Sequence, residues 1–142
     1  MQLDTYLFFN GDCAAALDLY KAAFGAQVTA LIRFRDAPDA ASTPPEWQDK
    51  IMHAVFRVGS KEVMASDGGN GEQRKPYSGF TLSLTADDAQ SGERFFRNLA
   101  EGGKVLTPWQ TTFWTKGFGM VTDRFGVPWL VNVAHESEVN AA

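Results

Sequence analysis

The sequence has little cysteine, no cluster of basic residues and no long apolar run. Cys13 is the one cysteine among 142 residues, so no internal disulfide can form. The 13 lysines and arginines are mostly isolated and the formal net charge is −4, which argues against a nucleic-acid partner. No apolar stretch approaches the roughly 20 residues that a membrane-spanning helix needs, and the N-terminal residues lack the pattern of a signal peptide. We therefore expect a cytoplasmic protein with neither a nucleic-acid nor a membrane partner.

Aromatic residues, in contrast, are plentiful. They make up 13% of the chain, with eleven phenylalanines and four tryptophans. Large rings fill a hydrophobic core, and they also line pockets for flat or apolar ligands. We expect most of them in the core and the rest in a ligand pocket or an interface.

The hydrophobic pattern predicts the order strand–helix–strand–strand–strand in each half of the chain. In the first half we expect strands over residues 2–9, 27–35, 51–58 and 61–66 and a helix over 13–24. In the second half we expect strands over 79–85, 104–109, 117–123 and 127–133, and a helix that begins at Asp87 and Asp88. Asp12 is placed to cap the first helix, and Gly25 is placed to end it.

This repetition predicts the fold class. Module one covers about residues 2–66 and module two about residues 79–134, with a polar, glycine-rich linker at 67–78. Neither half can bury its sheet alone, so the halves are interpreted as a pair. The prediction is an α+β fold of two βαβββ modules within a single domain over residues 1–142.

Several segments carry motifs of a known protein family. They are Tyr6–Asp12, Ala16–Gly25, Ile51–Ala54, Met64–Asp67, Trp114, Gly117–Gly119 and Asp123–Trp129. These segments resemble PhnB-like proteins of the glyoxalase/bleomycin-resistance/dioxygenase (vicinal oxygen chelate) superfamily, and the resemblance covers about residues 2–134. It implies that the two modules form an incomplete glyoxalase-like β-barrel around a cavity, and that the protein is a homodimer.

Metal enzymes of this superfamily hold a divalent ion with His, Gln or Glu side chains on four strands, and the ion stabilises an enolate-like charge. Alignment on Gly11, Ala65, Gly79 and Gly126 places the four ligand positions on Thr5, Ala65, Phe80 and Leu130. None of these residues is a usual metal ligand. We therefore expect no metal or other cofactor in this protein.

His53 is the candidate for acid–base catalysis, because histidine titrates near neutral pH. If Gly59 and Ser60 form a two-residue turn, Ala54 pairs with Ala65 and His53 faces away from them. The aligned ligand positions put the cavity on the side of Ala65. The sequence leaves two interpretations open, a structural hydrogen-bonded histidine and a histidine in the pocket.

The other pocket candidates are aromatic or lie near strand ends. Trp109, Trp114 and Phe118 crowd into a short stretch, and they either form a pocket wall or belong to the core and a dimer interface. Asp67 and Asn132 are polar residues that can reach the cavity. With the aligned ligand positions, the predicted pocket comprises Thr5, Ala65, Asp67, Phe80, Trp109, Trp114, Phe118, Leu130 and Asn132.

Two functions fit these observations. In the first, the protein binds a small apolar or aromatic molecule without metal, by analogy with bleomycin-resistance relatives that sequester drugs. In the second, it is a lyase, isomerase or dioxygenase-like enzyme that uses His53 or an unrecognised divalent metal site. Trp109, Phe113 and Trp114 form the expected dimer patch.

Overall fold

The computed structural model describes residues 1–68 and 76–135 and divides into two compact units, Met1–Lys75 and Pro76–Ala142. We refer to these units as module one and module two. The division falls within the linker expected at 67–78, most of which lies outside the described residues. The expectation of a single domain stays a prediction.

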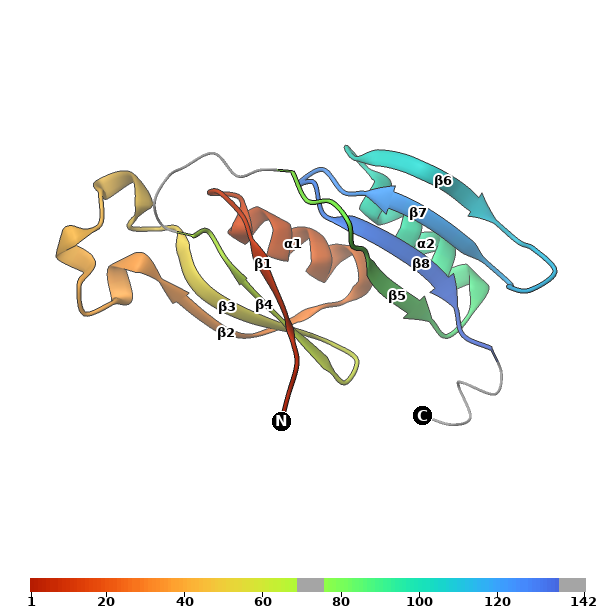
Figure 1. Ribbon diagram of the computed structural model, residues 1–142, viewed down its shortest axis with the longest axis horizontal. Helices are drawn as coiled ribbons and strands as arrows, with labels where there is room; N and C mark the ends of the chain where they lie inside the picture. Colours follow the sequence, from red (N-terminus) through yellow and green to blue (C-terminus); the bar gives the residue numbers. More distant parts are fainter. Residues whose placement is uncertain (69–75, 136–142) are drawn as a thin grey trace. The chain divides into compact units, whose positions relative to one another are not determined.

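Each module contains a four-stranded sheet and one long helix in the same chain order (Figure 1). Module one consists of β1 (Thr5–Phe8), α1 (Cys13–Phe24), β2 (Gln27–Arg33), β3 (Ile51–Val58) and β4 (Lys61–Ser66). Module two consists of β5 (Leu82–Ala86), α2 (Ala89–Ala100), β6 (Lys104–Gln110), β7 (Phe118–Thr122) and β8 (Pro128–Val133). Three short 3₁₀ turns, Phe34–Asp36, Ala40–Ser42 and Pro45–Trp47, lie between β2 and β3. None of the helices within the described ranges is long and apolar enough to cross a membrane.

The sheet topology repeats as well. The strand order is β1-β4-β3-β2 in module one and β5-β8-β7-β6 in module two. In each sheet the first and last strands of the module pair in parallel, and the other neighbours pair antiparallel. The predicted α+β class and the repeated βαβββ order are therefore confirmed.

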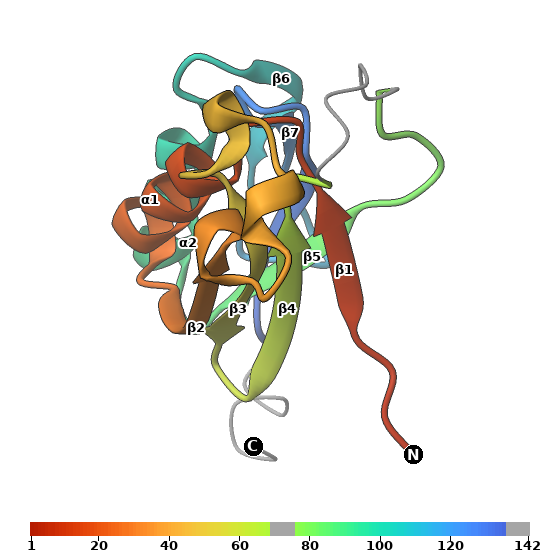
Figure 2. The same cartoon turned by 90° about the vertical axis from the view of Figure 1, so that its left-hand side faces the viewer.

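In module one, α1 covers one face of the sheet (Figure 2). The ring of Tyr20 on α1 lies 5.5 Å from the ring of Phe56 on β3, and both residues are fully buried. Leu7, Ala54 and Ala65 are also buried. Burial of a large apolar side chain contributes roughly 1.5–3 kcal/mol, so this contact holds the helix on the sheet.

In module two, α2 packs against its sheet through close ring contacts. The ring of Phe96 on α2 lies 5.9 Å from the ring of Trp109 on β6. A Cβ atom added at Gly119 on β7 would lie 2.7 Å from the Phe96 ring. Only glycine allows an aromatic ring so close to the backbone, so the sequence at this position permits the packing of α2.

The two helices are capped in different ways. On α2, the Asp88 side chain accepts a hydrogen bond from the Ser91 backbone N–H at 2.7 Å. On α1, Asp12 occupies the N-cap position, but its side chain makes no capping hydrogen bond, so the predicted side-chain cap is wrong. The buried Asp67 supplies it instead, because Asp67 Oδ1 accepts from the Cys13 backbone N–H at 2.9 Å.

Candidate functional site

The strand register separates the sheet of module one into two faces. Leu7 pairs with Ala65, and Ala65 pairs with Ala54, so these side chains share the face that α1 covers. Successive side chains of a strand point to opposite faces, and the neighbouring residues therefore lie on the other side. We call this side the open face of module one. It carries Tyr6, Phe8, His53, Val55, Met64 and Ser66.

The open face corrects one expectation about His53. His53 faces away from Ala65, as the predicted register requires. The aligned ligand positions, however, predict the cavity on the side of Ala65, and the structure shows that α1 and the core fill that side. Thr5 lies on the α1 side as well, because it pairs with Val63. His53 is therefore on the face that the module's own helix leaves uncovered.

Three polar side chains on this face form a hydrogen-bonded chain. The Tyr6 Oη atom lies 2.9 Å from Nδ1 of His53, and the two rings are 5.7 Å apart. The Ser66 hydroxyl hydrogen-bonds to Tyr6 and accepts a bond from the Gly68 backbone N–H at 3.0 Å. Phe8 stacks on Tyr6 with a centroid distance of 4.7 Å and an interplanar angle of 19°. Aromatic and polar groups thus meet on one patch of β1, β3 and β4.

Burial changes the ionisation of two neighbouring groups. It raises the pKa of the Tyr6 phenol, while the hydrogen bond from Ser66 lowers that pKa by less. The phenol therefore keeps its proton at neutral pH and can donate it in a hydrogen bond. Burial raises the pKa of Cys13 to about 12, and the negative charge of Asp67 makes a smaller contribution in the same direction. Since the thiolate is the reactive form, Cys13 is not a nucleophile at neutral pH.

An open face of module two is defined by the same alternation. Gly119 and Val131 pair on the α2 side, so their strand neighbours project from the opposite side. Phe118, Leu130 and Asn132, all of them predicted pocket residues, share this face, and Phe118 pairs directly with Asn132.

The side-chain oxygen of Asn132 on that face lacks a hydrogen bond among the described residues. This Oδ1 atom is buried, and it has no hydrogen-bond partner in the part of the chain that the structure describes. An unpaired buried carbonyl costs roughly 1–3 kcal/mol. A hydrogen-bond donor on a bound molecule would remove this cost.

The remaining predicted pocket residues lie elsewhere. Ala65 is completely buried and Asp67 is 2% exposed, so both are core residues. Trp109 packs on the α2 side of its sheet. Phe80, before β5, and Trp114, in the loop after β6, are 44% and 55% exposed.

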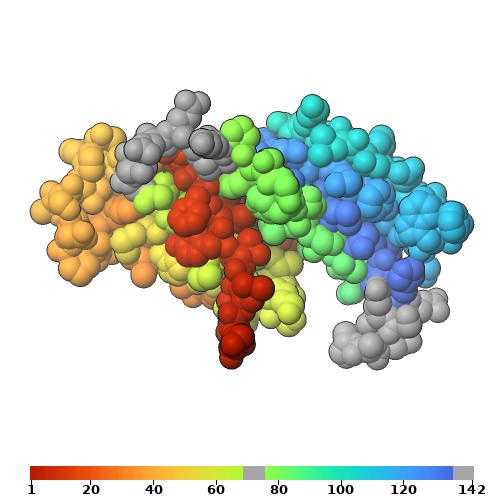
Figure 3. Space-filling view, viewed as in Figure 1, coloured from red at the N-terminus to blue at the C-terminus, as the bar shows by residue number. Residues whose placement is uncertain are grey.

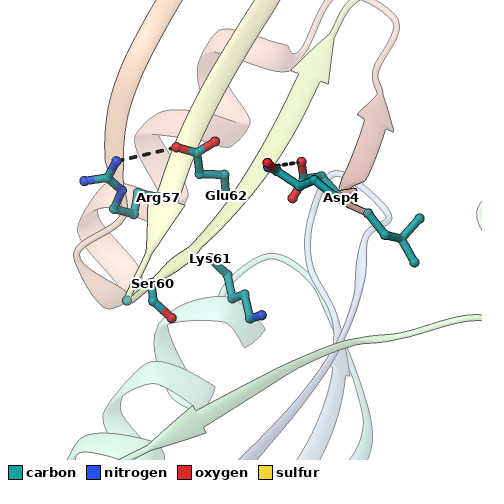
Figure 4. A pocket seen from close by; sticks show the side chains of 8 residues that line it. Asp4, Arg57, Ser60, Lys61 and Glu62 are labelled. Carbon is teal, nitrogen blue, oxygen red and sulfur yellow. Dashed lines mark hydrogen bonds and ion pairs between the residues drawn. The ribbon is translucent and has the colours of Figure 1, made fainter. Parts of the chain in front are cut away.

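Two hollows on the surface are lined by residues other than those named for the open faces. A polar pocket of about 650 Å³ at the β3–β4 turn is lined by Gln2, Leu3, Asp4, Arg57, Gly59, Ser60, Lys61 and Glu62 (Figure 4). Arg57 points toward Glu62 at 3.5 Å, and the pocket mixes charges of both signs. A groove of about 560 Å³ between α2 and β6 is lined by Glu93, Phe96, Arg97, Ala100, Glu101, Val105, Pro108 and Trp109. Neither hollow includes His53.

Comparison with known proteins gives the family. Residues 2–131 match the model described as the Glyoxalase/Bleomycin resistance protein/Dioxygenase superfamily. The chain belongs to this superfamily. Protein YjdN of Escherichia coli is 40% identical over 144 residues, which cover 96% of this chain and 97% of YjdN.

Solved structures of similar proteins agree with this membership of the superfamily. PA1353 from Pseudomonas aeruginosa is 44% identical, with a TM-score of 0.82, and the match covers 94% of this chain and 97% of that chain. The PhnB protein from Bacillus cereus has a TM-score of 0.79 at 22% identity, covering 94% of this chain and all of that one, and shows the shared fold alone. The predicted resemblance to PhnB-like proteins is confirmed.

The donor set of the superfamily's metal enzymes does not fit this chain. Of the four aligned positions, Ala65 is buried under α1 and Thr5 lies on the same side. Phe80 lies outside the sheet, and Leu130 has no donor atom. Among the described residues, no group of three His, Cys, Asp or Glu side chains is placed to hold a metal ion.

Sequence reasoning missed Tyr6, Phe8 and Ser66. The spacing of Tyr6 and Phe8 was the available signal, because residues two apart on a strand share a face. Leu7 and Phe9 are apolar too, so no contrast marked which pair lies opposite the helix.

Proposed function

We propose that this protein binds a small apolar or aromatic molecule on the open face of module one, without the metal ion of its superfamily. The observation that supports this most is the stacked pair of Tyr6 and Phe8, which are 36% and 51% exposed. β1, red in Figure 3, lies at the surface. Two stacked rings offer apolar area, and His53 beside them offers a polar anchor.

The first test uses 2-naphthol as a fluorescent aromatic probe. We expect protein dialysed against EDTA to bind 2-naphthol as tightly as untreated protein. The double variant Tyr6→Ala/Phe8→Ala should bind about tenfold more weakly, since each aromatic contact is worth roughly 0.5–1.5 kcal/mol. Leu31→Ala is the matched control, because Leu31 is an exposed apolar residue on the α1 side of the same sheet. Loss of binding after EDTA treatment, or equal weakening by Leu31→Ala, would refute the proposal.

A second candidate function is a metal-independent isomerase or lyase. The hydrogen bond between Tyr6 and His53 favours it, because an oriented histidine on an open face can transfer a proton to or from a bound molecule. His53→Gln, which keeps an N–H donor but cannot accept and release a proton near neutral pH, would then abolish turnover, whereas probe binding through the Tyr6 and Phe8 rings would persist. If the protein binds carbonyl compounds but converts none of them, the second function is refuted and the binding function stands.

We also propose a homodimer. Phe113 is 98% and Trp114 55% exposed, and their rings meet edge to face at 5.0 Å in the loop after β6. Trp109, the third residue of the expected patch, packs on Phe96 and is therefore left out of it. Exposed apolar patches of this kind mark interfaces.

Light scattering tests the dimer. We expect about twice the single-chain mass of 15.6 kDa for the native protein at tens of micromolar, and a monomer for Phe113→Ala/Trp114→Ala. Leu106→Ala, which removes another exposed apolar side chain, should leave the dimer intact. A native mass of one chain would refute the dimer, and a dimeric double variant would refute the patch.

A further inference from the structure

The hydrogen bond between Tyr6 and His53 has a preferred direction. Tyr6 Oη lies 2.9 Å from Nδ1 of His53. Burial raises the pKa of the Tyr6 phenol, so the phenol keeps its proton at neutral pH. An imidazole nitrogen is a much stronger base than a phenol oxygen and is therefore the better acceptor, so the Tyr6 hydroxyl donates to Nδ1.

This direction determines the tautomer of His53. A neutral imidazole carries one proton, and the nitrogen that accepts a hydrogen bond is the one without it. Nδ1 of His53 accepts from Tyr6, so the proton resides on Nε2. The Tyr6 hydroxyl is thus a positioning group, which acts on a ligand through His53, whereas the Tyr6 ring is part of the binding surface itself.

The Nε2 atom is available to a bound molecule. In the described part of the chain, Tyr6 is the one hydrogen-bond partner of the His53 ring. Among the same residues, Asn132 Oδ1 is the one side-chain nitrogen or oxygen atom that is both buried and without a hydrogen-bond partner. Because His53 Nε2 has no partner among them either, it is not buried and is accessible at the surface. A donor whose ring is oriented by a hydrogen bond loses little freedom when it binds an acceptor.

We infer that His53 presents Nε2–H as a fixed hydrogen-bond donor, and that the ligand carries an oxygen acceptor such as a carbonyl beside its aromatic part. The ligand class rests on the proposed binding function, whereas the tautomer does not. The stacked rings of Tyr6 and Phe8 would hold the apolar part, and His53 would select the acceptor.

The tautomer is measured by long-range ¹H–¹⁵N correlation spectra of the histidine rings at about pH 8.5, where histidine side chains are neutral. We expect His53 to be almost entirely the Nε2–H form. Tyr6→Phe, which removes the hydroxyl and keeps the ring, should return His53 to the tautomer mixture of a short histidine peptide measured under the same conditions. An Nδ1–H form of His53, or no change in Tyr6→Phe, would overturn the inference.

The ligand class is tested with acetophenone and toluene, which share a ring and differ in the carbonyl. One net hydrogen bond corresponds to about a tenfold difference in affinity. We expect the native protein to bind acetophenone about tenfold more tightly than toluene. In His53→Phe, which keeps a flat ring, the ratio should fall to about one.

The two experiments separate the two proposals. Equal binding of both probes by the native protein would overturn the ligand class while the binding function stands. Binding of neither probe would overturn the binding function and the ligand class together, and the spectra would still decide the tautomer.

Discussion

Replacing Asp67 with alanine is expected to destabilise the protein by roughly 4 kcal/mol. The carboxylate is 2% exposed and accepts three backbone hydrogen bonds, from Gly11, Cys13 and Ile51, at 2.8, 2.9 and 2.9 Å. Each bond to a charged acceptor contributes roughly 1.5–3 kcal/mol, and its removal leaves a buried N–H without a partner. Asp67 ties the end of β4 to the start of α1 and the start of β3, so its loss loosens three elements at once.

Asp12→Ala is the matched control for this prediction. Asp12 lies at the start of the same helix, but it is exposed and its side chain makes no capping bond. Its charge near the helix N-terminus contributes at most about 1 kcal/mol. Urea denaturation of both variants, followed by circular dichroism, gives the comparison. A larger loss for Asp12→Ala than for Asp67→Ala would show that the cap has been assigned to the wrong residue.

Gly117→Ala is expected to cost roughly 3 kcal/mol in the stability of module two. A Cβ atom at this position would overlap Cζ2 of Trp109, far inside van der Waals contact. The indole cannot retreat easily, because Gly92 on α2 and the ring of Phe96 lie against it as well. Overpacking of this kind forces side chains out of their preferred rotamers.

A double-mutant cycle with Trp109→Leu separates this clash from other causes. Leucine at 109 vacates the space that the new methyl group needs, so Gly117→Ala should cost less than about 1 kcal/mol in that background. The midpoints of thermal unfolding for the four proteins provide the coupling energy. Equal costs in both backgrounds would place the strain in the Gly117 backbone rather than against Trp109.

The order of the elements follows from local sequence patterns. Hydrophobic periodicity alone separates the helices from the strands, and Gly25 ends α1 with a φ of 77°, as expected for a helix C-terminus. The two-residue turn at Gly59 and Ser60 predicts the pairing of Ala54 with Ala65, which is observed. These features depend on residues that are close in sequence. The repeated order of elements was predictable for the same reason, because each element in it has its own local pattern.

The tertiary structure alone decided which sheet face is open and what the polar residues do. Tyr6, Leu7, Phe8 and Phe9 are all apolar or aromatic, so the pattern of β1 contains two hydrophobic faces and does not say which one the helix takes. Asp67 and Cys13 are 54 residues apart, and nothing local reveals that the carboxylate caps a helix that far away. The Tyr6–His53 contact likewise spans 47 residues across β4. A sequence pattern reports the period of an element, whereas the partners of its side chains are set by the packing of distant segments.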